Sequence, residues 1–123
     1  MKKYTAESVT EGHPDKVCDI IADSVLDECL RFDMASRVAC EVMATQGHIL
    51  EAGEIAGSHI PRVQEIVRDV LRRVGYPEDR YTLEVLLHRQ SPDISAGVTG
   101  PLEARAEQAE GMQLCAGDQG VMV

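Results

Sequence analysis

Aromatic and basic side chains are scarce in this 123-residue sequence. It contains no Trp, one Phe and three Tyr, so we do not expect a platform on which nucleic-acid bases stack. The 12 Lys and Arg are outnumbered by 21 Asp and Glu, which gives a net charge of −9. An acidic chain repels nucleic acid and anionic membranes, and neither is an expected partner. A polyanionic ligand would therefore require metal ions or a few well-placed basic groups.

Long apolar runs and paired zinc ligands are also missing. No apolar stretch is long enough to span a membrane, and Met1-Lys2-Lys3 is followed by polar residues rather than by the apolar core of a signal peptide. The cysteines, Cys18, Cys29, Cys40 and Cys115, include no Cys-x-x-Cys pair, which argues against structural zinc. We therefore expect reduced thiols and a cytoplasmic location.

Helical periodicity is clear in two segments. Apolar residues recur at helix spacing over residues 17–30 and again over residues 60–74. Ser58 or His59 is expected to cap the second helix, and Gly75 follows its last periodic residue as a typical stop.

The strands are predicted from alternation and β-propensity. Residues 37–44 and 49–55 flank a Gln-Gly turn and predict a hairpin. Residues 81–88 are β-prone and consistent with a central strand. Together with the helices, these strands predict one α+β domain, with the helices packed on one face of a mainly antiparallel sheet. Residues 121–123 look like the opening of a further strand, so we expect the chain to derive from a longer protein.

The segment Gly12-His13-Pro14-Asp15-Lys16 places three ionisable groups at the start of the first helix. Helix capping explains it, because Pro suits the first helical turn and a carboxylate stabilises a helix N-terminus. A ligand site explains it equally, because helix N-termini favour anions and a carboxylate can hold Mg²⁺ against a phosphate. His13 could then donate an N–H to a leaving group that gains charge. The residue pattern by itself leaves both interpretations open.

Further polar groups are ambiguous in the same way. Glu41 and Glu54 lie on the two strands of the hairpin, where they either face solvent or bind a cation or a substrate ammonium. The Gly- and Pro-rich segment 90–117 is either a surface connection or a lid over a ligand. Asp118 stands between two glycines, as a turn residue or as a ligand contact.

Four motifs in order remove much of this ambiguity. "ESVTEGHPDK", "GEI", "QSPDI" and "GDQG" resemble the N-terminal domain of S-adenosylmethionine synthetase (methionine adenosyltransferase) over residues 7–122. The resemblance implies one of three similar domains in an enzyme that joins ATP and L-methionine. In that reaction the methionine sulfur attacks the ribose 5′ carbon, and the displaced triphosphate is cleaved to phosphate and diphosphate. The resemblance also implies Mg²⁺ as a cofactor, K⁺ as an activator, and a homo-oligomer, dimer or tetramer, whose sites form between two subunits.

The same resemblance assigns expected roles at the matching positions. His13 would contact the ATP phosphates and assist departure of the triphosphate. Asp15 would bind Mg²⁺, Glu41 would belong to the K⁺ site, and Glu7 would lie close by.

The methionine contacts implied by the resemblance are Glu54, Gln90 and Asp118. The implied gating loop consists of Gln90, Ser91, Pro92, Asp93, Ile94, Ser95, Ala96, Gly97, Val98, Thr99 and Gly100. Thr99 stands where an Asp is common in the family, and no role is transferred to it.

Members of this family are much longer, and essential basic residues come from a central domain that residues 1–123 do not contain. We therefore expect this chain alone to be inactive as an enzyme. One alternative is a non-catalytic module derived from the family. Another, independent of the family, is a Mg²⁺-dependent phosphohydrolase that uses His13 and Asp15.

Overall fold

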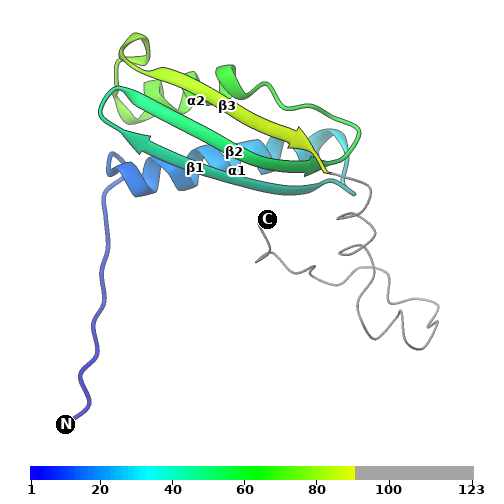
Figure 1. Cartoon of the computed structure of the whole chain (residues 1–123). Coiled ribbons are helices and arrows are strands. Elements are labelled where there is room, and N and C mark those ends of the chain that lie inside the picture. Colours follow the sequence, from blue (N-terminus) through cyan, green and yellow to red (C-terminus); the bar gives the residue numbers. More distant parts are fainter. Residues whose placement is uncertain (91–123) are drawn as a thin grey trace, which may run out of the picture.

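Two helices lie against one face of a three-stranded sheet in the computed structural model, which describes residues 1–90 (Figure 1). The predicted α+β class is confirmed. The elements are α1 (Pro14–Phe32), β1 (Arg37–Thr45), β2 (His48–Ala56), α2 (Val63–Val74), the short 3₁₀ turn η1 (Glu78–Arg80) and β3 (Thr82–Arg89). The predicted strand at residues 121–123 lies outside the described residues.

The sheet has the order β1-β2-β3 and is mixed. The predicted hairpin is present, since β1 and β2 pair antiparallel from Arg37↔Ala56 to Thr45↔His48. β3 pairs with β2 in parallel, because α2 returns the chain to the end of the sheet at which β2 begins. β2 is therefore the central strand of the described sheet, and β3 lies at an edge of it.

The core lies between the helices and one face of the sheet. Its buried apolar side chains come from α1, α2 and β2, namely Val17, Ile21, Val25, Cys29, Ile49, Ile55, Val63, Ile66, Val67, Val70 and Leu71. No helix within residues 1–90 crosses the opposite face of the sheet (Figure 1). This open face carries Ala39, Glu41 and Met43 on β1, Leu50, Ala52 and Glu54 on β2, and Glu84, Leu86 and His88 on β3. Large apolar groups are solvent-exposed there, with Met43 61% and Leu86 44% accessible.

The start of α2 differs from the prediction. The helix begins at Val63, its N-cap is Arg62, and no side chain in the described residues caps it. Ser58 and His59 are not caps, because their side chains bind elsewhere. The Ser58 backbone N–H and hydroxyl both donate to Asp33 Oδ2, at 2.9 and 3.1 Å. The predicted end of the helix is confirmed, since Gly75 is the C-cap with φ 87°.

Glu28 on α1 is buried, although its charge suggested the polar side of the helix. Its Oε1 accepts hydrogen bonds from the Arg62 backbone N–H, at 3.0 Å, and from His59 Nε2, at 2.9 Å. Burial by itself would raise the pKa of Glu28, but the bonds from His59 and Arg62 and the Arg62 charge hold that pKa below its usual value. Glu28 therefore fastens the β2–α2 connection to α1.

None of the helices in the described part reaches the combination of length and hydropathy needed to cross a bilayer.

Candidate functional site

His13 is the N-cap of α1. The helix-capping interpretation of residues 12–16 is therefore correct. Its Nδ1 accepts a hydrogen bond from the Asp15 backbone N–H at 3.2 Å. Pro14, which has no N–H to donate, occupies the first turn. The His13 side chain is 43% exposed and the Asp15 side chain 88% exposed. Both groups thus face solvent at a helix N-terminus, and capping leaves the His13 Nε2 and the Asp15 carboxylate accessible to a ligand.

The donor set at α1 suits a metal held jointly by protein and ligand. The Asp15 carboxylate has one near partner among the described residues, His13 Nδ1 at 3.9 Å from its Oδ2. Mg²⁺ often takes one or two carboxylates and completes its shell with water and phosphate oxygens, so Asp15 fits that role. No group of three His, Cys, Asp or Glu within residues 1–90 could hold a metal by itself. The assignment of Glu41 to a K⁺ site stays a prediction.

The predicted residues Glu41, Glu54 and Gln90 form a second group, separate from α1. Glu41 pairs with Ala52, and Glu54 pairs with Ala39, so the two acids are diagonal neighbours on the open face. His88 lies beside Glu54 in the β2–β3 register. The chain reaches Gln90 just beyond this point.

Gln90 is tied to the same end of the sheet as Glu54. Its backbone N–H donates to the Ile55 carbonyl at 3.0 Å. Its side-chain Oε1 is buried, and no described residue donates a hydrogen bond to it. The predicted methionine contacts Glu54 and Gln90 are therefore brought together, whereas Asp118 and loop residues 91–100 lie outside the described residues.

His13 and Asp15 lie at one end of the sheet, Glu54 and Gln90 lie toward the other, and Glu41 lies at the middle of β1. α1 begins near the β1–β2 turn, and β3 ends at the other end (Figure 1). Gly12 and Pro14 line the same cavity as Thr45 and Gln46 of that turn. From His48, next to the turn, to Glu54 is six residues, or about 20 Å along the strand at about 3.3 Å per residue. One chain therefore does not bring His13 and Glu54 to a single small ligand.

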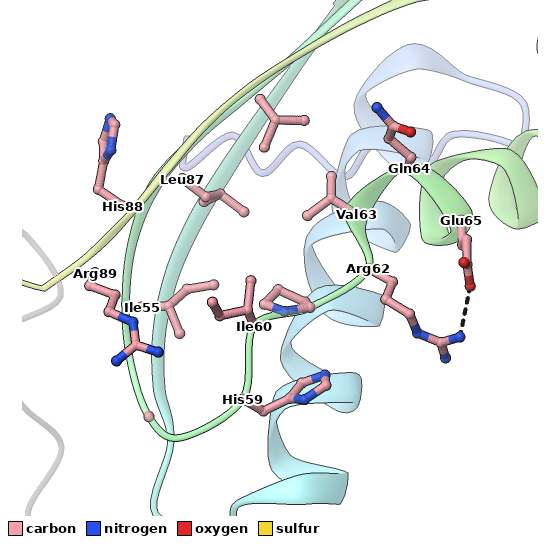
Figure 2. Close-up of a pocket in the computed structure, with 13 residues that line it drawn as sticks. Ile55, His59, Ile60, Arg62, Val63, Gln64, Glu65, Leu87, His88 and Arg89 are labelled. Atoms are coloured by element: carbon pink, nitrogen blue, oxygen red, sulfur yellow. Dashed lines mark hydrogen bonds and ion pairs between the residues drawn. The ribbon is translucent and has the colours of Figure 1, made fainter.

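Two cavities lie beside these groups. The larger, about 470 Å³, is lined by apolar residues such as Ile55, Ile60 and Leu87, with His59 and Arg62 at its margin. Figure 2 shows Ile55, Ile60 and Leu87 on the strand side of the β2–α2 connection, with His59 and the Arg62–Glu65 ion pair on its other side. The lining of this larger cavity includes none of the predicted site residues. The smaller cavity, about 380 Å³, is lined by Gly12 and Pro14, the two neighbours of His13, whereas Ile55 and Arg89 of the larger cavity are the neighbours of Glu54 and Gln90.

An unanticipated acid lies in the core. Glu51 on β2 is fully buried, and its Oε1 accepts from Cys40 Sγ at 3.1 Å. Its Oε2 has no hydrogen-bond partner among the described residues. Burial raises the pKa of Glu51, and the bond from Cys40 opposes this only in part. Cys18, Cys29 and Cys40 are free thiols, as predicted for the described cysteines.

Sequence reasoning missed Glu28, Glu51 and Tyr76, and each had a signal. Glu28 falls on the Val17–Ile21–Val25 stripe at helical spacing, and Glu51 is two residues from Ile49 on a strand. Tyr76 follows the helix stop Gly75, and its hydroxyl bonds to the Gly12 carbonyl oxygen at 2.6 Å. In the first two cases the pattern indicated burial while the charge suggested exposure.

Comparison with known proteins gives a consistent result. Residues 1–92 match the family model described as "S-adenosylmethionine synthetase, N-terminal domain". A protein named S-adenosylmethionine synthase from Brachyspira hyodysenteriae is 45% identical over 126 aligned positions, which cover 97% of this chain and 32% of that protein. One of the same name from Mycoplasma capricolum subsp. capricolum is 40% identical, with 97% and 30% covered.

A solved structure has a similar fold. It is titled an unusual S-adenosylmethionine synthetase from Campylobacter jejuni, and it superposes with a TM-score of 0.62 at 36% identity. The match covers 68% of this chain and 26% of that one. The chain thus spans about a third or less of the length of the relatives it matches.

Proposed function

Since this chain belongs to the S-adenosylmethionine synthetase family, we propose that residues 1–123 are the N-terminal domain of an enzyme that makes S-adenosylmethionine from ATP and L-methionine. The observation that carries this proposal is the exposed start of α1, where His13 and Asp15 stand together at a helix N-terminus. The remainder of the catalytic machinery belongs, in this proposal, to the central domain of the longer enzyme.

The difficult part of this reaction is the departure of the leaving group. A thioether sulfur is already nucleophilic, so the reaction needs no base on methionine. The displaced triphosphate carries several negative charges, so charge neutralisation and positioning dominate. His13 would donate from Nε2 to a phosphate oxygen, and the positive end of the α1 dipole would favour the same anion. Asp15 would hold Mg²⁺, which when bound neutralises phosphate charge.

Glu54, Gln90 and Asp118 are proposed to contact methionine, with residues 90–100 as the gating loop. A carboxylate suits the substrate ammonium, and an amide side chain can donate and accept. The placement of Glu54 and Gln90 at one end of the sheet supports this grouping. Glu41 is proposed to contribute to a K⁺ site only together with groups beyond the described residues.

The separation of the two groups supports a site shared between subunits. Glu54 lies about 20 Å along β2 from the turn beside which α1 begins, too far for His13 and Glu54 of one chain both to touch one nucleotide–methionine pair at its reacting atoms. In a two-fold assembly, each surface patch meets its own copy. Packing of two open faces would bring the α1 end of one chain toward the Glu54 end of its partner. We therefore propose a homo-oligomer, at least a dimer, with methionine and phosphate contacts from different chains.

Calorimetric titration with magnesium tripolyphosphate tests the phosphate half of this proposal. The 123-residue chain should bind this probe, and Asp15→Asn should weaken binding about tenfold because the metal ligand is lost. Asp19→Asn, one turn along α1 and also exposed, is the matched control and should bind as the parent does. Equal affinity of the parent and Asp15→Asn would contradict the assignment.

A second assay addresses the isolated chain. With ATP, L-methionine, Mg²⁺ and K⁺, it should form no S-adenosylmethionine. Methionine-dependent release of phosphate and diphosphate would show that the fragment is itself an enzyme. ATP hydrolysis that needs no methionine would instead favour a phosphohydrolase.

A further inference from the structure

Tyr76 connects the end of α2 to the segment in front of α1. Its hydroxyl donates a hydrogen bond to the Gly12 carbonyl oxygen at 2.6 Å, across 64 residues of sequence. Gly12 directly precedes His13, the N-cap of α1. The bond therefore reaches the peptide that carries the predicted phosphate contact.

The hydroxyl is held in place by the way α2 ends. Gly75 adopts φ 87°, and the Tyr76 backbone N–H donates to the Leu71 carbonyl at 2.9 Å. This left-handed helix end turns the chain sharply and fixes the direction of the next residue. The Tyr76 ring then packs edge-on against Tyr81, with centroids 6.1 Å apart. Backbone and ring are thus both constrained before the hydroxyl meets Gly12.

The peptide between Gly12 and His13 is held at both ends. Tyr76 binds its carbonyl oxygen, and its N–H donates to the Thr10 carbonyl at 3.0 Å. Because a peptide unit is planar, two such bonds fix its orientation and with it the start of the His13 side chain. The third constraint is the capping bond from the Asp15 N–H to His13 Nδ1.

The capping bond also decides which ring nitrogen of His13 can donate. A neutral imidazole has one donor and one acceptor nitrogen. Since Nδ1 accepts from Asp15, the proton lies on Nε2 in this geometry. If the Gly12–His13 peptide moves and the capping bond breaks, either ring nitrogen of His13 can carry the proton.

We propose that Tyr76 is a positioning residue, which anchors the Gly12–His13 peptide so that His13 keeps its cap on α1 and presents Nε2–H to a ligand phosphate. The proposal rests on the proposed function for the identity of the ligand, whereas the anchoring itself concerns the unliganded chain. In this role Tyr76 acts through His13.

Nuclear magnetic resonance of the 123-residue chain at one fixed, mildly alkaline pH tests the anchor. Tyr76→Phe keeps the ring and removes the hydroxyl, and Tyr81→Phe removes the hydroxyl of its ring partner as the matched control. In Tyr76→Phe the ¹⁵N shifts of the two His13 ring nitrogens should move toward each other, because the single tautomer is lost. Exchange of the Asp15 amide should become about fivefold faster, equivalent to about 1 kcal/mol for one hydrogen bond. Tyr81→Phe should leave both signals in place.

The result that overturns the anchor is equally specific. If Tyr76→Phe is folded and the His13 ring and Asp15 amide signals match those of the parent, Tyr76 does not position His13. If Tyr76→Phe does not fold, a measurement on the parent chain still tests the anchor. A nuclear Overhauser contact between the Tyr76 ring and the Gly12 α-protons supports the anchor, and its absence overturns it.

Binding of magnesium tripolyphosphate separates this inference from the proposed function. Tyr76→Phe should weaken binding about fivefold relative to both the parent and Tyr81→Phe. Unchanged affinity overturns the positioning role in ligand binding. Failure of the parent chain to bind the probe counts against the phosphate role of His13, and the magnetic resonance result still decides whether Tyr76 anchors it.

Discussion

Replacing Glu51 by Met should stabilise the domain and remove much of its loss of stability as the pH rises above 4.5. Glu51 is fully buried among apolar residues, and within the described residues its Oε2 has no hydrogen-bond partner. Its single partner, Cys40 Sγ at 3.1 Å, is a weak donor. Met follows a similar unbranched path and has no oxygen to leave unsatisfied.

The size of the expected stabilisation follows from the unpaired Oε2 of Glu51. A buried acceptor without a partner costs about 1–3 kcal/mol, so Glu51→Met should raise the free energy of unfolding by about 2 kcal/mol at neutral pH. Cys40 loses its acceptor in the variant, but a thiol loses little by this. For a small protein with a urea m-value of about 1–2 kcal/mol/M, the unfolding midpoint should rise by about 1–2 M.

The pH dependence has a definite sign. Burial raises the pKa of Glu51 in the folded chain above 4.5, the value expected when it is unfolded. Below pH 4.5 both states bind the proton and the group does not favour unfolding. As the pH rises toward the folded pKa, the unfolded chain ionises first, and stability falls by up to about 1.4 kcal/mol per pH unit. Above the folded pKa the loss is complete.

Urea unfolding at several pH values between 4 and 9 measures both effects. Glu51→Gln keeps the shape and removes ionisation, so it separates the pH effect from packing. Glu11→Gln, at an exposed position, controls for the loss of one acid. A Glu51→Met variant that is less stable than the parent at pH 7, or that loses stability with rising pH as steeply as the parent, would refute the idea that the buried carboxyl destabilises the fold.

Four further substitutions test the other structural conclusions. Glu28→Gln should lower the free energy of unfolding by about 2 kcal/mol at pH 7, because charge-assisted hydrogen bonds are lost. Since the pKa of Glu28 lies below its usual 4.5, this stabilisation is present above pH 4.5 and disappears as the pH falls through the lowered pKa, so urea unfolding of parent and variant should converge in acid. Gly53→Ala should cost about 3 kcal/mol, because Gly53 has φ 149° and a Cβ there would overlap the Ala39 carbonyl. Gly75→Ala should lower the free energy of unfolding by about 1 kcal/mol, because its Cβ meets open space and only the strain of the left-handed backbone conformation remains. Equal shifts in melting temperature for Gly53→Ala and Gly75→Ala would contradict this difference. Leu86→Lys should weaken self-association through the open face, and an unchanged sedimentation coefficient at high concentration would show that this face is not the interface.

Local pattern alone determined most of the elements of this protein. Helical spacing located α1 and α2 to within three residues at their ends, and alternation located the hairpin. Gly75 was predicted as the end of α2 because few other residues tolerate its backbone conformation. These features depend on neighbours within a few positions, and a linear sequence displays such neighbours directly. The four family motifs are short strings and are visible for the same reason.

Tertiary structure decided what depends on distant partners. α2 starts at Val63 and is not capped by Ser58 or His59 as predicted, because these two residues bind acids more than 20 positions away in the sequence. Glu28 could be buried only because the β2–α2 connection supplies its donors. Likewise, the hydroxyl of Tyr76 reaches Gly12 only after α2 has packed against α1.

The same distinction holds for the candidate site. Residue types at His13, Asp15, Glu54 and Gln90 suggested the chemistry, but the sequence did not indicate that these residues divide between two ends of one sheet. The parallel return of β3 decides this, because it brings Gln90 beside Ile55 rather than beside α1. Residue identity therefore predicted which groups would act on a phosphate or an ammonium. The path of the chain through space determined which of them lie within reach of one another, because strand pairing joins residues that the sequence keeps far apart.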